Sequence, residues 1–230
     1  MRVMAKAKAA VWQAPMRPAD DLWCIAHEKR DWRCRLHPKT LGLALAGALL
    51  GELVLAGRVA IVEDDEVEVR DVEPPDDAFQ HVMLAYIRSE KPLDVRTWLQ
   101  FFAADKAKSL VVERLLLAGL AEVVEVSRLR RNTSRELWPS DLDKAVWRPL
   151  RLRHLIMGDQ RTMPAATWDE ITLAGLVQAV GLLPSVLWEE HAAGDAWLRQ
   201  LIGEQAPPDL RRLCAAVQTL VGDAVLSHHG

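Results

Sequence analysis

The chain has 230 residues, of which 50% are hydrophobic and 27% are charged, and its formal net charge at pH 7 is −3. This composition supplies a sizeable core and excludes global disorder. The small negative net charge excludes a bulk attraction to nucleic acid or membrane, so any such binding must come from a local surface. Three cysteines cannot all pair, and no secretory signal precedes them, which predicts a reducing, cytoplasmic location.

Residues 1–19 are basic, alanine-rich and closed by Pro15 and Pro18. We predict that they form a flexible arm, because their apolar run is too short for a signal sequence. Residues 20–228 contain no long linker, and we therefore expect them to form a single domain.

Two short strands are expected next, at residues 22–27 and 33–37, around a polar turn. The first strong helix is expected at residues 41–56, where leucine recurs every four positions. Gly57 follows at the C′ position, where glycine commonly ends a helix. A second leucine-rich segment also ends in an Ala-Gly pair, at Gly119, so the same transition from helix to hairpin is expected twice.

The helix at residues 41–56 is apolar enough to raise the question of a membrane span. Its uncharged part, residues 41–51, is too short, because a spanning helix needs about 20 apolar residues. We therefore interpret it as a helix buried on nearly all sides. Glu52 and Arg58 interrupt the apolar run, and at least one of them is expected at the core boundary with a polar partner, since an unpaired buried charge is costly.

The rest of the chain alternates helical patterns with hairpin patterns. Helices are predicted at residues 77–89, 95–104, 106–118, 142–157, 165–180, 184–192 and 210–226. Short strands are predicted at residues 58–62, 67–72, 123–129 and 135–138. The predicted fold class is mainly α, with a helical core bundle surrounded by amphipathic helices and two or three short β-hairpins.

Charge is unevenly distributed along the sequence. Residues 62–77 contain nine acidic residues and one arginine, a local net charge of −8. Residues 128–153 contain eight basic residues and three acidic residues, a local net charge of +5. Either stretch would attract a partner of opposite charge if it formed one face, whereas the alternative is two solvated loops.

Four residues of the types that bind zinc lie close together, at Cys24, His27, Cys34 and His37. The six residues between the two pairs fall short of the spacings found in zinc fingers. On a strand, Cys24 and His27 would also point to opposite faces. We therefore predict that the protein has no metal site, and that the cysteines act as small apolar side chains.

The sequence contains no recognisable catalytic pattern. Ser127, Ser134 and Ser185 lack the GxSxG context of a nucleophile elbow. The glycines in residues 42–51 lie within a leucine-rich helix and do not form a phosphate loop. We predict that the protein is not an enzyme and needs no cofactor.

The basic stretch has two interpretations that composition does not separate. A helix followed by a hairpin is the outline of a winged helix, in which Arg128, Arg130 and Arg131 could contact nucleic-acid phosphates. The same arginines could bind anionic lipid headgroups, helped by apolar residues such as Leu129 and Trp138.

One segment of the chain resembles a known family. The apolar run LGLALAGALLGELVLAGRVAI at residues 41–61 closely resembles the core helix of the Golgi phosphoprotein 3-like family, in the form found in actinobacteria. The order of the other elements is also similar: the preceding DLWCIAH, the helix around Trp98, and ERLLLAG before a hairpin. The resemblance covers about residues 20–228.

This resemblance implies a mostly α-helical fold and a peripheral membrane function without catalysis. Eukaryotic members of the family bind phosphatidylinositol 4-phosphate and the cytoplasmic tails of glycosyltransferases. Their headgroup pocket corresponds by position to four residues here, of which only the last keeps a positive charge: His37, Ala46, Asp105 and Lys108. Their hydrophobic hairpin tip corresponds to residues 127–131, where Leu129 is the one apolar side chain.

The sequence therefore predicts a cytoplasmic adaptor attached to the inner face of the membrane through the basic hairpin and the helix after it. The predicted lipid-binding residues are Lys108, Arg128, Leu129, Arg130, Arg131 and Arg135. The predicted partners are anionic phospholipid headgroups, phosphoinositides among them, and a partner protein or the tail of a membrane enzyme. The alternatives are a winged-helix-like nucleic-acid binder and a soluble protein adaptor without lipid binding.

We further expect the eight bases of residues 128–153 to form a contiguous positive surface with Lys108 nearby. Such a surface would attach to anionic membrane mainly by charge, and its binding would fall steeply as salt rises.

Overall fold

The computed structural model describes residues 17–127, 133–158 and 166–226. These residues form ten α-helices and two antiparallel two-stranded sheets. The predicted fold class, mainly α with short β-hairpins, is therefore confirmed. Most of the predicted N-terminal arm lies outside the described residues.

The first described helix, α2 (Pro18–Ile25), replaces the strand predicted at residues 22–27, and that prediction is wrong. Pro18 and two aspartates occupy the first turn of α2, where both residue types favour a helix. Every residue of α2 is buried, so its sequence lacks the alternation of apolar and polar positions that identifies an amphipathic helix. The predicted first hairpin is reduced to an isolated β-bridge between His27 and Cys34.

The core helix is α3 (Pro38–Leu55), and its residues 40–53 are all buried. It begins after His37, whose side chain accepts a hydrogen bond from the backbone N–H of Lys39. It ends before Gly57, which has the positive φ of 68° expected of a C′ glycine. By length and composition alone, α3 is the one described helix that could span a membrane, but most of it is buried inside the fold.

The other elements follow in chain order. Before the second hairpin lie β1 (Val59–Ile61), β2 (Val67–Val69), α4 (Ala78–Ser89), α5 (Val95–Ala103) and α6 (Lys106–Leu117). From the second hairpin onward lie β3 (Ala121–Ser127), β4 (Thr133–Pro139), α7 (Leu142–Met157), α8 (Trp168–Ala179), α9 (Leu183–Leu187), the 3-10 helix η1 (Trp188–Glu190), α10 (His191–Gln205) and α11 (Pro208–Leu226). The bounds of α7 are those predicted, and α4, α5 and α6 differ from prediction by one residue at one or both ends.

Helix α10 is the element that the sequence pattern missed. A helix was predicted at residues 184–192, but the chain breaks at Trp188, which has a φ of 52°, and α10 begins three residues later. Only Gly194 and Leu198 of α10 are buried. An apolar face this narrow leaves no periodic signal in the sequence.

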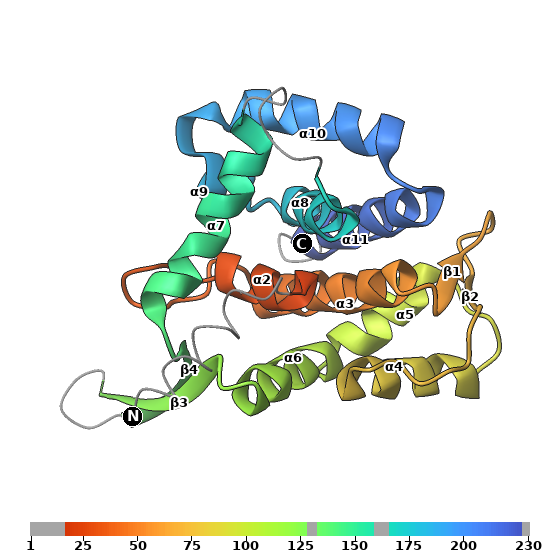
Figure 1. Ribbon diagram of the computed structural model, residues 1–230, viewed down its shortest axis with the longest axis horizontal. Coiled ribbons are helices and arrows are strands. Elements are labelled where there is room, and N and C mark those ends of the chain that lie inside the picture. The colour runs from red at the N-terminus through yellow and green to blue at the C-terminus, as the bar shows by residue number, and fades with distance from the viewer. Residues whose placement is uncertain (1–16, 128–132, 159–165, 227–230) are drawn as a thin grey trace.

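Figure 1 shows how the helices surround α3. Helices α8 and α11 lie on one side of it, with α10 beyond them, and α4, α5 and α6 lie on the other side. The β1–β2 hairpin stands at the end where α3 finishes, and α7 with the β3–β4 hairpin stands at the opposite end. The acidic stretch of the sequence and the described part of the basic stretch, residues 133–153, are therefore at opposite ends of α3.

Two glycines allow close packing against α3. A Cβ atom at Gly42 would overlap the carbonyl oxygen of Ala103, and one at Gly47 would overlap the side chain of Val217. The end of α5 and the middle of α11 therefore pack directly on the α3 backbone.

Candidate functional site

The predicted lipid-binding hairpin is present as β3 and β4. Its seven residue pairs run from Ala121 opposite Pro139 to Ser127 opposite Thr133. Arg135 is 79% exposed, and its Nε atom lies 3.6 Å from a carboxylate oxygen of Glu125 on the facing strand. Four predicted site residues fall outside the described residues: Arg128, Leu129, Arg130 and Arg131.

Arg148 does not belong to the surface, and in this respect the expected positive surface is wrong. Its side chain is buried, and its Nη1 atom lies 3.1 Å from Asp21 of α2. Ala145, Leu152 and Ile156 share its face of α7 and are also buried. The Arg148–Asp21 pair therefore fixes which side of α7 faces inward.

The outward side of α7 is partly apolar. Trp147 is 67% exposed, Leu150 is 40% exposed and Met157 is 38% exposed. Their spacing places them on one side of the helix together with His154, which is also exposed. Apolar side chains that are exposed together on one surface are typical of an interaction site. We refer to Trp147, Leu150, His154 and Met157 as the α7 face.

Two arginines on the flanks of α7 are engaged by acidic residues from other elements. On one flank, Arg151 lies 2.5 Å from Glu170 of α8. On the other flank, Arg153 lies 2.7 Å from Glu190, and its guanidinium lies 4.2 Å above the ring centre of Trp188. Trp188 is itself 59% exposed. It therefore extends the apolar surface at the edge of the α7 face.

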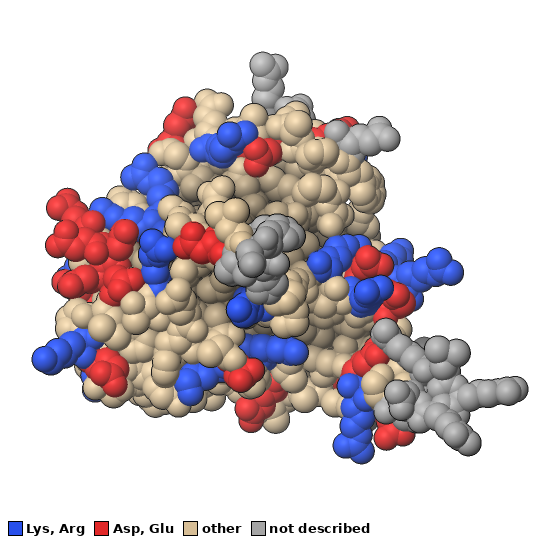
Figure 2. Space-filling view, turned by 180° about the vertical axis from the view of Figure 1, so that it is seen from behind, with Lys and Arg blue, Asp and Glu red and all other residues tan. Residues whose placement is uncertain are grey.

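These ion pairs change the expected balance of charge. Lys144 lies 3.1 Å from Asp141 in the first turn of α7, so it too has an acidic neighbour. Figure 2 shows acidic side chains gathered at one edge of the molecule, over the β1–β2 hairpin, while basic and acidic side chains are interspersed toward the opposite edge. The described bases of residues 133–153 therefore carry little uncompensated charge, and the apolar part of this surface is larger than the sequence predicted.

The charge of Lys108 acts on the segment between α2 and α3. The lysine is exposed on α6. Burial lowers the pKa of His27, a hydrogen bond with the Trp23 carbonyl opposes this shift, and the charge of Lys108 adds to the lowering. Lys108 also acts on the thiol of Cys34. Lys108 therefore lies beside the loop that joins α2 to α3.

Of the four positions that correspond to the family's headgroup pocket, three are exposed and one is buried. His37, Asp105 and Lys108 are exposed near the start of α3 and of α6. Ala46 is buried within α3. In this chain the Ala46 side chain is therefore out of reach of a headgroup.

A buried ion network joins helices α2, α3, α4 and α6. Arg114 of α6 lies 2.8 Å from Glu52 and 2.7 Å from Asp20. Glu52 also accepts hydrogen bonds from the Gln80 side chain at 3.1 Å and the Ala19 backbone N–H at 3.0 Å. The expectation that Glu52 has a polar partner is confirmed. The sequence did not indicate Arg114, because its partners lie far away along the chain.

The two buried carboxyl groups of α2, Asp20 and Asp21, have raised pKa values. Burial raises the pKa of Asp20 to about 7, although the attraction of Arg114 opposes the shift. Burial likewise raises the pKa of Asp21 to about 6, against the attraction of Arg148. The two pairs bind α2 to both α6 and α7, so the orientation of α7 depends on the interior of the molecule.

Three of the four residues of zinc-binding type have other surroundings. Cys24 is buried in α2, and burial raises the pKa of its thiol. The Nδ1 atom of His27 lies 2.6 Å from the Trp23 carbonyl oxygen, and the Cys34 thiol donates to the Leu36 carbonyl. Across the part of the chain that the structure describes, no group of three or more His, Cys, Asp or Glu residues is arranged to hold a metal ion.

Comparison with known proteins adds one finding. The family model of Golgi phosphoprotein 3 (GPP34) matches residues 19–217, from the first turn of α2 to the middle of α11. A search of curated proteins finds no match to the chain.

Proposed function

The chain belongs to the Golgi phosphoprotein 3 (GPP34) family, and from this premise we propose that it is a non-enzymatic, peripheral protein that binds anionic membrane surfaces. The observation that carries the proposal is the α7 face, in which Trp147 is the most exposed side chain and beside which Trp188 lies. Tryptophan side chains prefer the boundary between headgroups and acyl chains, because the ring is apolar and its N–H is polar.

The energetic contribution of this surface is substantial. Each partly exposed apolar side chain that enters the bilayer boundary contributes about 1 kcal/mol. Trp147, Leu150, Met157 and Trp188 together would contribute about 4 kcal/mol, which equals the contribution of about four basic residues beside an anionic bilayer. Attachment therefore depends on both apolar insertion and charge.

The hairpin supplies the charge in this proposal. It packs next to α7 through β4. Arg128, Arg130 and Arg131 would contact headgroups and Leu129 would enter the boundary. Arg135 would contribute less, because the nearby Glu125 carboxylate offsets its charge. Lys108 would form a second basic contact near the loop between α2 and α3. Because Ala46 and Asp105 do not supply the charges of a headgroup pocket, we expect the lipid to be selected by its charge alone.

Sedimentation with vesicles tests the proposal. Vesicles of phosphatidylcholine, of phosphatidylglycerol and of phosphatidylinositol 4-phosphate in phosphatidylcholine provide the comparison, at low and at physiological salt. We expect binding to both anionic vesicles, without preference for the phosphoinositide beyond its charge. Replacing Trp147 and Leu150 by serine should weaken binding about tenfold or more, since about 2 kcal/mol of apolar contact is lost.

Matched variants separate the two contributions. Val72→Ser changes a residue that is 60% exposed near the other hairpin, and it should leave vesicle binding unchanged. Arg128→Glu combined with Arg131→Glu should weaken binding most at low salt. If the Trp147 and Leu150 variant binds like the unmodified protein, the α7 face is not a membrane surface. Binding of duplex DNA without binding of vesicles would favour the nucleic-acid alternative, and binding of neither would favour a protein adaptor.

A further inference from the structure

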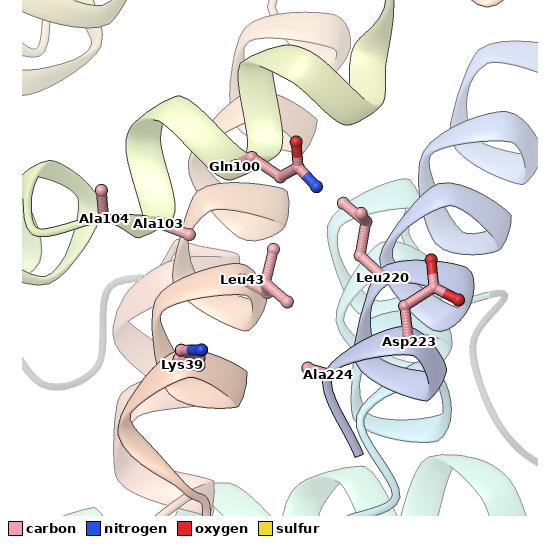
Figure 3. A pocket seen from close by; sticks show the side chains of 8 residues that line it. All are labelled: Lys39, Leu43, Gln100, Ala103, Ala104, Leu220, Asp223 and Ala224. Carbon is pink, nitrogen blue, oxygen red and sulfur yellow. The ribbon is translucent and has the colours of Figure 1, made fainter. Parts of the chain in front are cut away.

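A groove lies between α5 and α11, with α3 as its floor, and it is separate from the α7 face. Its volume is about 470 Å³, which is within the range of small-molecule sites. Most of its lining side chains are apolar: Leu43, Ala103, Ala104, Leu220 and Ala224. Figure 3 shows Leu43 of α3 and Leu220 of α11 pointing toward one another across it.

Small residues keep the groove open. Ala103 and Ala104 form its wall on α5, and Gly42 lets this end of α5 approach the α3 backbone closely. A larger side chain at either alanine would occupy the space. The groove is therefore an apolar slot whose width is set by methyl groups, which suits an unbranched hydrocarbon chain.

The rim of the groove has an uneven charge. Asp223 on α11 lies 3.0 Å from Arg96, so its negative charge is compensated. Lys39 on the first turn of α3 is exposed at one end of the groove, and no ion pair to it is found among the described residues. The first turn of α3 contains no acidic residue, and the N-terminus of an 18-residue helix adds a partial positive charge. This end of the groove favours an anion.

We propose that the groove binds a single-chain anionic amphiphile, with its acyl chain between Leu43 and Leu220 and its anionic group beside Lys39. Fatty acids and lysophospholipids share this chemistry. The proposal does not depend on membrane attachment through α7, since the two sites have no residue in common. Gln100, at the end opposite Lys39, is where the methyl end of a longer chain would leave the groove.

Isothermal titration with dodecanoate, with lysophosphatidylglycerol and with dodecyltrimethylammonium, each below its micelle concentration, tests this proposal. We expect one molecule of either anionic amphiphile to bind per chain, and the cationic one to bind more weakly. Ala104→Trp should reduce the affinity for dodecanoate at least about tenfold by filling the slot. Lys39→Glu should reduce it about tenfold and favour the cationic amphiphile instead.

Two control variants match these changes. Ala85→Trp alters an exposed alanine of α4, and Lys91→Glu alters an exposed lysine beyond the opposite end of α5, and both should bind dodecanoate normally. Thermal unfolding checks that all four variants are folded. The proposal is overturned if neither anionic amphiphile binds, if Ala104→Trp binds like Ala85→Trp, or if Lys39→Glu leaves the preference for the anion unchanged. Sedimentation of the Ala104→Trp variant with vesicles should match that of the unmodified protein, which separates this result from the function of α7.

Discussion

The two hairpins of this protein begin in the same way and end in different environments. Helices α3 and α6 both end at a leucine and are followed by an Ala-Gly pair, whose glycine has a φ of 68° at Gly57 and 66° at Gly119. In both, the N–H of the residue after the glycine donates to the carbonyl five residues earlier, which is the Schellman pattern. The local sequence therefore specifies the same C-terminal helix cap before each hairpin.

The difference arises from what covers each hairpin afterwards. At the first hairpin, the Ile61 N–H donates to the Asp209 carboxylate of α11, and Arg212 donates to the Ile61 carbonyl. At the second, exposed side chains such as Val123, which is 55% exposed, line the seven-residue strands. The first hairpin is therefore fixed by α11, whereas the second contacts α7 through β4 and keeps side chains of β3 available to a partner.

The largest effect is expected at the contact between the two helices that precede the hairpins. Arg114→Leu would leave Glu52 and Asp20 buried without their cation, and we expect the free energy of unfolding to fall by about 3–5 kcal/mol. Urea denaturation measures this change. Arg88→Leu, at an exposed arginine of α4, should change stability by less than about 0.5 kcal/mol. A loss below about 1 kcal/mol at Arg114 would mean that the two helices are held by apolar packing alone.

The second-largest expected effect is a dependence of the free energy of unfolding on pH. The pKa of Asp20 is raised from 3.8 to about 7 in the folded protein, so the native state keeps a proton that the unfolded chain loses above about pH 4. Stability should therefore fall as pH rises from about 4 to 7, by an amount on the order of 2–4 kcal/mol. Asp20→Asn should remove the fall in stability between about pH 6 and 7 in urea denaturation, whereas part of the fall below pH 6 should persist because the pKa of Asp21 is also raised, to about 6. An unchanged pH profile in that variant would contradict the assignment to Asp20.

A smaller effect distinguishes the two hairpins directly. Asp209→Ala removes the acceptor of the Ile61 N–H and should cost about 1–2 kcal/mol of stability. Glu125→Ala removes the exposed partner of Arg135 in the second hairpin and should cost less than about 0.5 kcal/mol. Equal losses in the two variants, measured by thermal unfolding, would show that α11 does not hold the first hairpin in place.

The smallest effect tests the common start of the hairpins. Gly57→Ala and Gly119→Ala each place a Cβ atom on a residue with positive φ, where space is available but the conformation is unfavourable. Each should cost about 1 kcal/mol, and the two costs should agree. Clearly unequal costs would indicate that one transition relies on tertiary contacts more than on its own backbone.

The predictions from sequence succeeded where one side of a helix faces solvent. Helices α5 and α7 were predicted nearly to the residue because their buried and exposed positions alternate with the helical period. Helix α2 is buried on every side and has only 8 residues, so its sequence was too short and too uniform to identify a helix. The 18-residue α3 is also buried on nearly all sides, but its length and leucine spacing identified it. Helix α10 was missed because it buries almost nothing.

The candidate site was predicted less completely, because its charges are compensated by distant residues. A count of bases along residues 128–153 cannot reveal that Asp21 pairs with Arg148, that Glu170 pairs with Arg151, or that Glu190 pairs with Arg153. The apolar α7 face was present in the predicted helix 142–157. Its exposure became clear only once the partner of Arg148 defined the inward side.

The burial of α3 has a consequence for synthesis on the ribosome. The helix that most resembles a membrane span emerges before α8 and α11, which cover one side of it. Val217 of α11 packs against Gly47, so the core cannot close until α11 has left the exit tunnel. During that interval the nascent chain presents a long apolar segment, and we expect it to depend on chaperones that shield such segments from aggregation.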